Sequence, residues 1–234
     1  MTEIPSALHV DGLAKRYGRH WVLAHVGFSI PRGSALLVTG ANGAGKSTLL
    51  GILATALPFD HGRISVAGHD LKDSLHAARR STAFVGHLGG IYRTLSAREN
   101  LSIWTQHLGM CSDDQIGFAL DRVGLAMAAE KTVDAFSAGM RRRLALARAL
   151  LQIAAGQRDI VLLDEPYEQL DRAGFLFVDD LIDEWRKTGL TVVLATHLIE
   201  RALPHSSHVI HLDHGRARFF GHASSFDPNA PELT

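Results

Sequence analysis

Cysteine is almost absent from this sequence, and so are long apolar segments. Cys111 is the only cysteine among 234 residues, which excludes an internal disulfide framework and indicates a reducing, cytosolic environment. No apolar run approaches the about 20 residues that a membrane-spanning helix needs. The first residues lack both the basic and the apolar region of a secretion signal. We therefore expect a protein that reaches a membrane only through another chain.

Net charge is also absent. Lysine and arginine together number 24, and so do aspartate and glutamate, so no overall basic charge attracts the chain to nucleic acid or anionic lipid. Consecutive arginines at 141–143 form a local basic run, but it lacks the accompanying aromatic residues that would stack on bases. We interpret this run as a solvated or dimer-facing stripe and expect no nucleic-acid partner.

The 46% apolar content is ordinary for a globular protein, and the length fits a single domain over residues 1–234. Short apolar segments alternate with helical patterns, which indicates an α/β fold with a parallel sheet covered on both faces. Residues 8–30 read as the short strands and turns of an N-terminal antiparallel β subdomain. The expected strands include 35–38, 63–68, 83–86, 160–163 and 191–195, and the expected helices include 46–57, 97–108, 116–123, 141–151 and 172–187. Residues of about 1–87 and 141–234 would form the core, and about 88–140 an inserted helical subdomain.

A glycine-rich motif occupies residues 40–47, whose sequence GANGAGKS matches G-x-x-x-x-G-K-[ST] in full. An apolar strand precedes it and a helical segment follows it. The glycines let backbone N–H groups turn toward phosphate oxygens, and the helix presents its positive end to them. Lys46 would pair with the β- and γ-phosphates, and the Ser47 hydroxyl would bind Mg²⁺. The motif therefore predicts that the chain binds ATP with Mg²⁺.

Two acids, Asp164 and Glu165, end the apolar segment 160–163. Ligands of open α/β sheets bind at the carboxyl ends of the strands, so Asp164 would bind Mg²⁺ and Glu165 would orient or deprotonate the attacking water. Acids also commonly end strands as solvated residues, but the glycine-rich motif favours the functional interpretation. His197 follows the next strand at the same edge and is expected to contact the γ-phosphate.

Residues 136–140, with the sequence FSAGM, precede a strong helix-forming segment. With this motif the sequence resembles the nucleotide-binding subunits of ATP-binding-cassette (ABC) transporters, whose signature is LSGGQ. The resemblance covers residues of about 8–221 and implies the P-loop NTPase core of an ABC ATPase. It also implies that Ser137 and Gly139 act on the ATP of a second subunit, in a homodimer or heterodimer. Tyr17 resembles the family's adenine-stacking aromatic residue, and Asp171 its D-loop aspartate.

Motifs and resemblance together define the expected site. The catalytic residues are Glu165, His197 and Lys46, and the metal ligands are Ser47 and Asp164. The nucleotide-binding residues are Tyr17, Gly40, Asn42, Gly43, Ala44, Gly45, Lys46, Ser47, Thr48, Ser137, Gly139 and Asp171.

The sequence departs from the family pattern in several places. His87 and Leu88 stand where the family has the Q-loop glutamine that links the metal and the attacking water to the membrane partner. Ala138 and Met140 replace the first glycine and the glutamine of the signature, and Glu168 replaces a serine of the D-loop. Because Lys46 and the two acids remain, we expect hydrolysis to survive, while a hydrolysis-poor member of a heterodimer stays an alternative.

A narrower resemblance is carried by residues 86–87, 95–101, 164–167 and 195–201. They look like the ATP-binding subunit of the haem exporter used in bacterial cytochrome c maturation. This implies integral-membrane permease subunits as partners and a peripheral position on the cytoplasmic face of the bacterial inner membrane. Other export-type cassettes share these residues, and a soluble, non-transporting ATPase switch is a third interpretation, although such proteins usually carry two fused cassettes or a coiled coil.

Four histidines, His205, His208, His211 and His214, recur at every third position. On a helix this spacing would bring them near one face, where they could ligate a metal or haem. Residues 209–212 instead read as a strand, on which odd spacing alternates between faces. We therefore expect these histidines to be surface and loop residues rather than a metal site.

Overall fold

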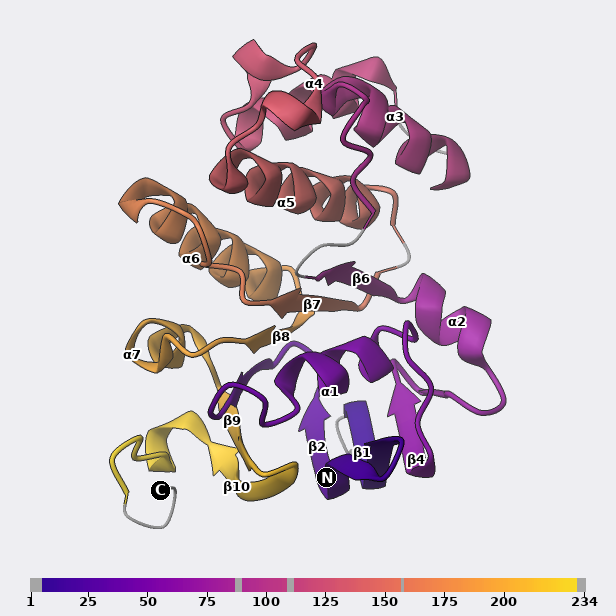
Figure 1. Cartoon of the computed structure of the whole chain (residues 1–234), viewed down its shortest axis with the longest axis vertical. Coiled ribbons are helices and arrows are strands. Elements are labelled where there is room, and N and C mark those ends of the chain that lie inside the picture. Colours follow the sequence, from indigo (N-terminus) through magenta and orange to yellow (C-terminus); the bar gives the residue numbers. More distant parts are fainter. Residues whose placement is uncertain (1–5, 87–89, 109–111, 157, 231–234) are drawn as a thin grey trace.

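Two β-sheets form the base of the molecule (Figure 1). The computed structural model describes residues 6–86, 90–108, 112–156 and 158–230. The antiparallel sheet has the order β2-β1-β4-β5, formed by β1 (Ser6–Tyr17), β2 (His20–Pro31), β4 (His61–Val66) and β5 (His69–Asp70). The second sheet has the order β10-β9-β3-β8-β7-β6, formed by β3 (Ala35–Thr39), β6 (Thr82–Val85), β7 (Ile160–Asp164), β8 (Thr191–Ala195), β9 (His208–Asp213) and β10 (Arg216–His222). Its strands pair in parallel except β10, which is antiparallel to β9.

Side chains of the central parallel strands alternate between two cores, as the period of two in a strand requires. In β3, Leu36 packs into the core shared with the antiparallel sheet, and Leu37 packs into the core beneath the helices. In β7, Leu162 and Leu163 divide in the same way. Burial on both faces explains why these strands have apolar rather than alternating sequences.

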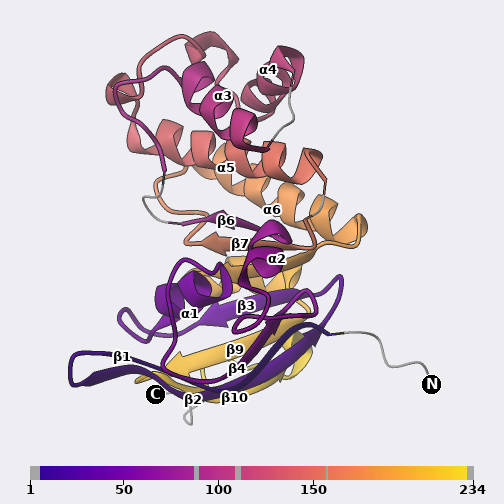
Figure 2. The ribbon, with the colours of Figure 1, turned by 90° about the vertical axis from the view of Figure 1, so that its right-hand side faces the viewer.

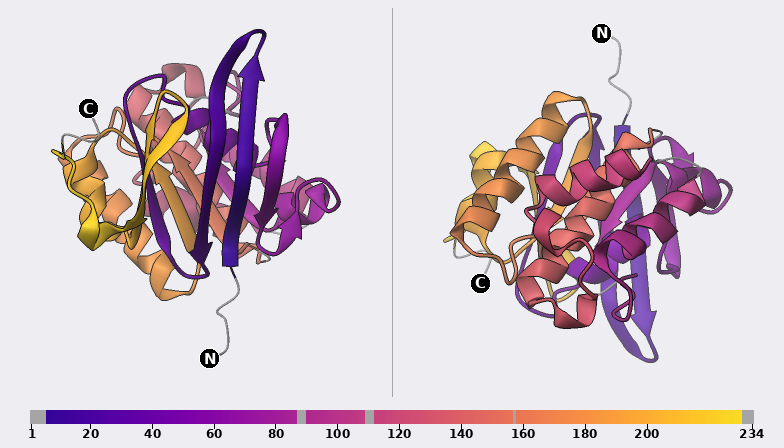
Figure 3. Two further views of the ribbon diagram at one scale, coloured as in Figure 1. Left: turned by 90° about the horizontal axis from the view of Figure 1, so that it is seen from below. Right: turned by 90° about the horizontal axis from the view of Figure 1, so that it is seen from above.

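Helix α1 (Lys46–Leu53) lies between the two sheets, where its buried leucines pack on both (Figure 2). Helices α5 (Ala138–Ala154) and α6 (Arg172–Lys187) cover the opposite face of the parallel sheet. Seen from below, the long strands β1 and β2 stand in front; seen from above, the helices do (Figure 3). The remaining helices are α2 (Leu75–Arg80) and α7 (Ile199–Ala202) near the sheet and α3 (Ala97–Leu108) and α4 (Asp113–Arg122) beyond α5. Within the described ranges no helix is both long and apolar enough to cross a bilayer.

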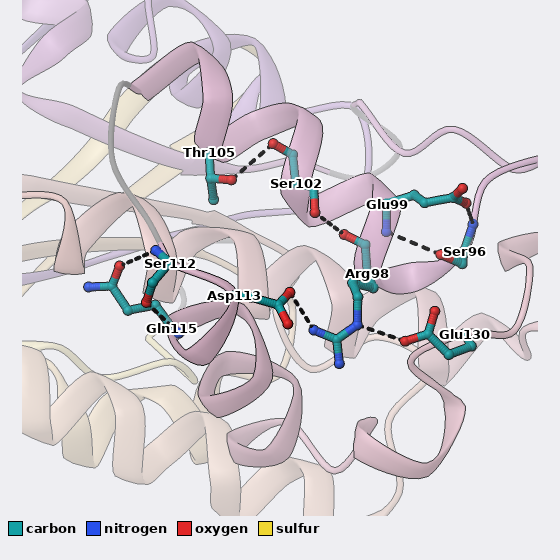
Figure 4. A network of polar contacts seen from close by, with 9 residues as sticks. All are labelled: Ser96, Arg98, Glu99, Ser102, Thr105, Ser112, Asp113, Gln115 and Glu130. Atoms are coloured by element: carbon teal, nitrogen blue, oxygen red, sulfur yellow. Dashed lines mark hydrogen bonds and ion pairs between the residues drawn. The ribbon is translucent and has the colours of Figure 1, made fainter.

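A polar network joins α3, α4 and the loop that follows α4 (Figure 4). Arg98 donates hydrogen bonds to Asp113 at 2.9 Å and to Glu130 at 2.7 Å. At the start of α3, the Ser96 N–H donates to the Glu99 carboxylate and the Glu99 N–H donates to the Ser96 hydroxyl, as in a capping box. Because the acidic partners of Arg98 are largely exposed, each ion pair contributes only about 0–1 kcal/mol. The network therefore fixes how these helices are oriented more than how stable they are.

Most of the predicted elements are confirmed. The helices expected at 97–108 and 172–187 have those bounds, and the strands expected at 35–38, 160–163 and 191–195 agree to within one residue. The short strands expected over 8–30 are wrong, since two twelve-residue strands, β1 and β2, occupy this region. Irregular pairing around Gly12 and His25, which have φ values of +59° and +57°, makes the sequence look interrupted.

The helix expected at 46–57 ends at Leu53 instead. Thr55 takes a left-handed conformation, with φ +58°, which stops the helix. Leu57 then folds back onto Gly51, where an added Cβ would lie 2.8 Å from the leucine side chain. The helix expected at 116–123 begins three residues earlier and ends one residue earlier, since α4 covers Asp113–Arg122. The division into a core and a helical subdomain at 88–140 stays a prediction.

Removing core volume from the parallel sheet should strongly lower the free energy of unfolding. Leu194 in β8 is fully buried, so Leu194→Ala is expected to lower this free energy by about 2–5 kcal/mol in denaturant titration. Leu176 on α6 is 55% exposed, and Leu176→Ala should change it by less than about 0.5 kcal/mol. Equal effects of the two substitutions would contradict the core assigned here.

Candidate nucleotide-binding site

The glycine-rich segment 40–47 connects β3 to α1, as its sequence context predicts. Gly40 and Gly45 have φ values of +143° and +105°, which non-glycine residues rarely adopt. A Cβ on Gly40 would lie 2.1 Å from the Leu212 carbonyl oxygen, and one on Gly45 would lie 2.8 Å from the Val22 oxygen. Both glycines are therefore required by conformation and by space, and together they hold the loop tightly against β2 and β9.

Lys46 is buried at the first position of α1. Its Nζ donates hydrogen bonds to the carbonyl oxygens of Gly40 at 2.8 Å and Ala41 at 3.1 Å. Both acceptors are neutral main-chain groups, so these bonds orient the ammonium group without neutralising it. A buried positive charge at a helix N-terminus favours a bound anion such as phosphate.

Ser47 and Asp164 meet at the carboxyl ends of β3 and β7. The Ser47 hydroxyl donates a hydrogen bond to Asp164 Oδ1 at 3.1 Å, and Asp164 is 4% exposed. A hydroxyl and a carboxylate this close are both hard oxygen ligands of the kind Mg²⁺ prefers. The pair therefore fits the predicted metal.

Glu165 and His197 also meet at this edge. His197 Nδ1 lies 3.1 Å from Glu165 Oε2, and the Glu165 N–H donates to the Ala195 oxygen at 2.8 Å. Glu165 has φ +48°, a conformation that costs a non-glycine residue about 1–3 kcal/mol and is concentrated at functional sites. The structure thus brings together the two residues expected to act on the water and the γ-phosphate.

The residues of the signature and the D-loop lie together at the starts of α5 and α6. Ser137 caps α5 by accepting a hydrogen bond from Met140 N–H at 3.1 Å, and Asp171 caps α6 by accepting one from Gly174 N–H at 2.8 Å. A Cβ on Gly139 would lie 2.8 Å from the Gln169 carbonyl oxygen. The two segments are therefore in direct contact within one chain.

Asp171 is bound from both sides. The Gly174 N–H and then the nearby Arg143 guanidinium hold the pKa of its carboxyl below the ordinary value. Arg143 donates to Asp171 Oδ1 at 3.1 Å. This ion pair links α5 to the residue that caps α6. Asp171 therefore stays ionised as a helix cap, and its expected contact with a second chain stays a prediction.

Tyr17 ends β1 and is 49% exposed. The Lys15 ammonium lies 5.3 Å from the centre of its ring, which leaves the aromatic surface partly open. Asn42 and Gly43 are exposed in the loop, and Thr48 is half-buried in α1. Stacking of adenine on Tyr17 stays a prediction, as do the individual phosphate contacts. His87 and Leu88, at the position of the expected glutamine, lie outside the described residues.

The interpretation of the arginine run as a solvated or dimer-facing stripe is wrong for Arg142. This side chain is buried and donates to the carbonyl oxygens of Gly86, Asp164 and Glu165. Burial lowers the pKa of its guanidinium, opposed by the nearby carboxylates of Glu168 and Asp164. Arg142 therefore ties the signature helix to the main chain of the two acids, a role that no local sequence pattern distinguishes from those of its half-buried neighbours Arg141 and Arg143.

The histidine series does not gather on one face. His208 and His211 lie in β9, as the strand interpretation predicts, His205 contacts Asp183, and His214 is exposed in the following turn. Within the residues described, no group of three or more His, Cys, Asp or Glu side chains has a geometry that could hold a metal ion.

The chain is similar to known proteins in sequence. The family model described as ABC transporter matches residues 23–168. A cytochrome c biogenesis ATP-binding export protein, CcmA of Xanthomonas oryzae pv. oryzae, is 37% identical over 89% of this chain and 95% of its own length. The daunorubicin resistance ATP-binding protein DrrA3 of Streptomyces coeruleorubidus is 36% identical over 90% of this chain, which spans only 66% of that relative's length.

The structural comparison agrees. The chain superposes on MJ0796, a bacterial ABC transporter cassette solved as a dimer, with a TM-score of 0.83, 25% identity, and coverage of 94% of this chain and 100% of the other. A strand, a phosphate-type loop and two acids at one sheet edge define a P-loop nucleotide-binding protein. Together with the family match, they show that this chain belongs to the ABC transporter family and carries its ATP-binding domain.

Removing the Arg142 side-chain charge should impair the chemistry of the site rather than nucleotide binding. Arg142→Met leaves the carbonyl oxygens of the two acids unsupported, and we expect ATP turnover to fall on the order of tenfold or more, because small displacements of catalytic groups are costly. Arg172→Met, at an exposed position of α6, is the matched control. Steady-state turnover beside fluorescent-nucleotide titration measures both effects, and unchanged turnover in Arg142→Met would contradict this role.

Proposed function

We propose that this chain binds and hydrolyses ATP and thereby energises a separate membrane permease. The observation that carries the proposal is the meeting of Ser47 with Asp164 and of Glu165 with His197 at one edge of the sheet. The Lys46 loop ends at the same edge. A phosphate cradle, a metal-binding pair and an acid–histidine pair are the parts that phosphoryl transfer to water requires.

Each residue has a role that follows from its position. Lys46 and the backbone N–H groups of residues 40–47 bind the β- and γ-phosphates. Ser47 and Asp164 supply oxygen ligands for Mg²⁺, which neutralises phosphate charge when bound. Glu165 accepts the proton of the attacking water. His197 keeps one ring nitrogen on Glu165 and offers the other to the γ-phosphate.

A second ATP-binding subunit completes the site in this proposal. Ser137 is exposed at the N-terminus of α5, where the helix dipole and free N–H groups favour a phosphate. Gly139 lies against the Gln169 carbonyl of its own chain, and in this proposal Ser137 and Gly139 act on the nucleotide of a partner. The dimeric form in which MJ0796 was solved supports this arrangement. Residues 88–140 would be the helical subdomain that moves with the permease.

For the cargo, we propose haem destined for cytochrome c. The alignment with CcmA runs over 95% of that protein, whereas the equally similar DrrA3 is matched over 66%. Tyr167 after the sequence Asp-Glu-Pro fits the same subfamily. The chain would then lie on the cytoplasmic face of the bacterial inner membrane, held by its permease. Export of another substrate, as the name of DrrA3 indicates for that protein, is the alternative.

Substitutions at the site should separate binding from chemistry. Glu165→Gln is expected to retain ATP and to lower turnover by about 10²–10⁴-fold, because it removes the proton acceptor but not the phosphate cradle. Lys46→Ala should abolish binding, as measured by fluorescent-nucleotide titration. Normal turnover in Glu165→Gln, or unchanged affinity in Lys46→Ala, would refute the assigned roles.

The partner and the cargo can be tested in cells. Detergent extracts should yield the chain together with an integral-membrane protein. Its expression with that permease, in a bacterium lacking its own haem-exporter ATP-binding subunit, should restore haem-stained c-type cytochromes. Glu165→Gln, expressed to the same level, serves as the inactive control. Normal ATP turnover without restored cytochromes would exclude haem as the cargo, and a chain recovered only on ribosomes or DNA would exclude the transporter.

A further inference from the structure

A carboxylate away from the phosphate loop collects contacts from several elements. Asp179 lies on the buried side of α6 and is 8% exposed. Its Oδ1 accepts a hydrogen bond from the Tyr167 hydroxyl at 2.8 Å, and its Oδ2 accepts one from the Arg201 guanidinium. His205 Nε2 lies 3.7 Å from Oδ1. Burying a carboxylate costs free energy unless it is paired and hydrogen-bonded. The contacts with Tyr167 and Arg201 offset this cost for Asp179.

The partners of Asp179 come from the two segments that directly follow the reacting side chains. Tyr167 lies two residues after Glu165, in the loop from β7 to α6. Arg201 lies four residues after His197, on α7. One carboxylate on α6 therefore contacts both segments at once. Glu165 and His197 are themselves 3.1 Å apart, so a shift of either segment changes that separation.

Aromatic and cation–π contacts also stabilise the packing of Tyr167 and Arg201 against α6. Tyr167 is 1% exposed, and its ring meets that of Phe175 edge to face at 5.7 Å. The Arg201 guanidinium lies 5.7 Å from the centre of the Tyr167 ring and 5.0 Å from that of Phe175, within the range of cation–π attraction. The Tyr167 side chain is thus clamped on its faces and at its hydroxyl, which leaves the loop little freedom.

The loop needs such an anchor because its backbone is unfavourable. Glu165 and Gln169, at either side of Tyr167, both have positive φ, at +48° and +65°. Left-handed residues other than glycine persist only where the surroundings hold them. Burial, and then the bond to Asp179, raises the pKa of the Tyr167 hydroxyl, so this group keeps its proton and remains a donor throughout the physiological pH range.

We propose that Asp179, by holding the Tyr167 hydroxyl and the Arg201 guanidinium together, positions Glu165 and His197 for ATP hydrolysis. Tyr167 and Arg201 are positioning residues in this scheme, since they act through their segments. The inference rests on the proposed ATPase function and assigns a part of its machinery. A purely structural role for the cluster would predict lost stability, with turnover falling only as far as folding does.

Tyr167→Phe is the sharpest test, because it keeps the ring and removes only the hydroxyl. We expect kcat to fall about tenfold, the KM for ATP and the nucleotide affinity to stay within about twofold, and the unfolding midpoint to change little. Asp180→Asn changes an exposed residue next to Asp179, and it is the matched control that should behave like the unsubstituted protein. Arg201→Lys should retain more turnover than Arg201→Met, because lysine keeps a positive charge that can pair with Asp179.

Coupling between the substitutions provides the second measurement. If Tyr167 and Arg201 act through one network centred on Asp179, the fold decrease of kcat in the double variant Tyr167→Phe/Arg201→Met should be smaller than the product of the two single fold decreases. Wild-type kcat in Tyr167→Phe, or a loss matched by Asp180→Asn, would overturn the inference. An unsubstituted protein that binds ATP without turning it over would instead refute the proposed function.

Discussion

The parallel pairing of β3, β8 and β7 is the constraint on which the site depends. It brings the carboxyl ends of three strands to one edge, so that loops far apart in the sequence emerge side by side. Ser47 and Asp164 are separated by 117 positions, yet their oxygens lie 3.1 Å apart. The register is set by burial, because a shift of one residue would move each apolar side chain into the opposite core.

The parts of the site that motifs describe were predictable from the sequence. The glycine-rich loop, the acid pair and His197 each follow an apolar strand, and the topology that unites them follows from alternating strands and helices. Helices 97–108 and 172–187 were also predictable, because their amphipathic spacing is regular. The long strands β1 and β2 were not, since their irregular pairing hides the period of two that identifies a strand.

The polar anchors beneath the site were not predictable either. Arg142 has the same sequence context as its neighbours in the arginine run, but its position on α5 points it at the carbonyl oxygens of the acid pair. Asp179 lies on a helix rich in acids, and only the packing of α6 against the residues after β7 and on α7 distinguishes it. Both cases depend on contacts between residues that are 12 or more positions apart in the sequence. Local sequence patterns do not encode such contacts.

The contact between Gly139 and the Gln169 carbonyl has a further consequence. Not even a methyl group fits between Gly139 of the signature segment and the segment that leads to α6, and Arg143, further along α5, pairs with Asp171 at the end of that second segment. A displacement of the signature segment would therefore be transmitted directly to the segment that leads to α6 in the same chain. In the dimer proposed above, direct packing contacts within each subunit would therefore couple the movements of the two nucleotide sites.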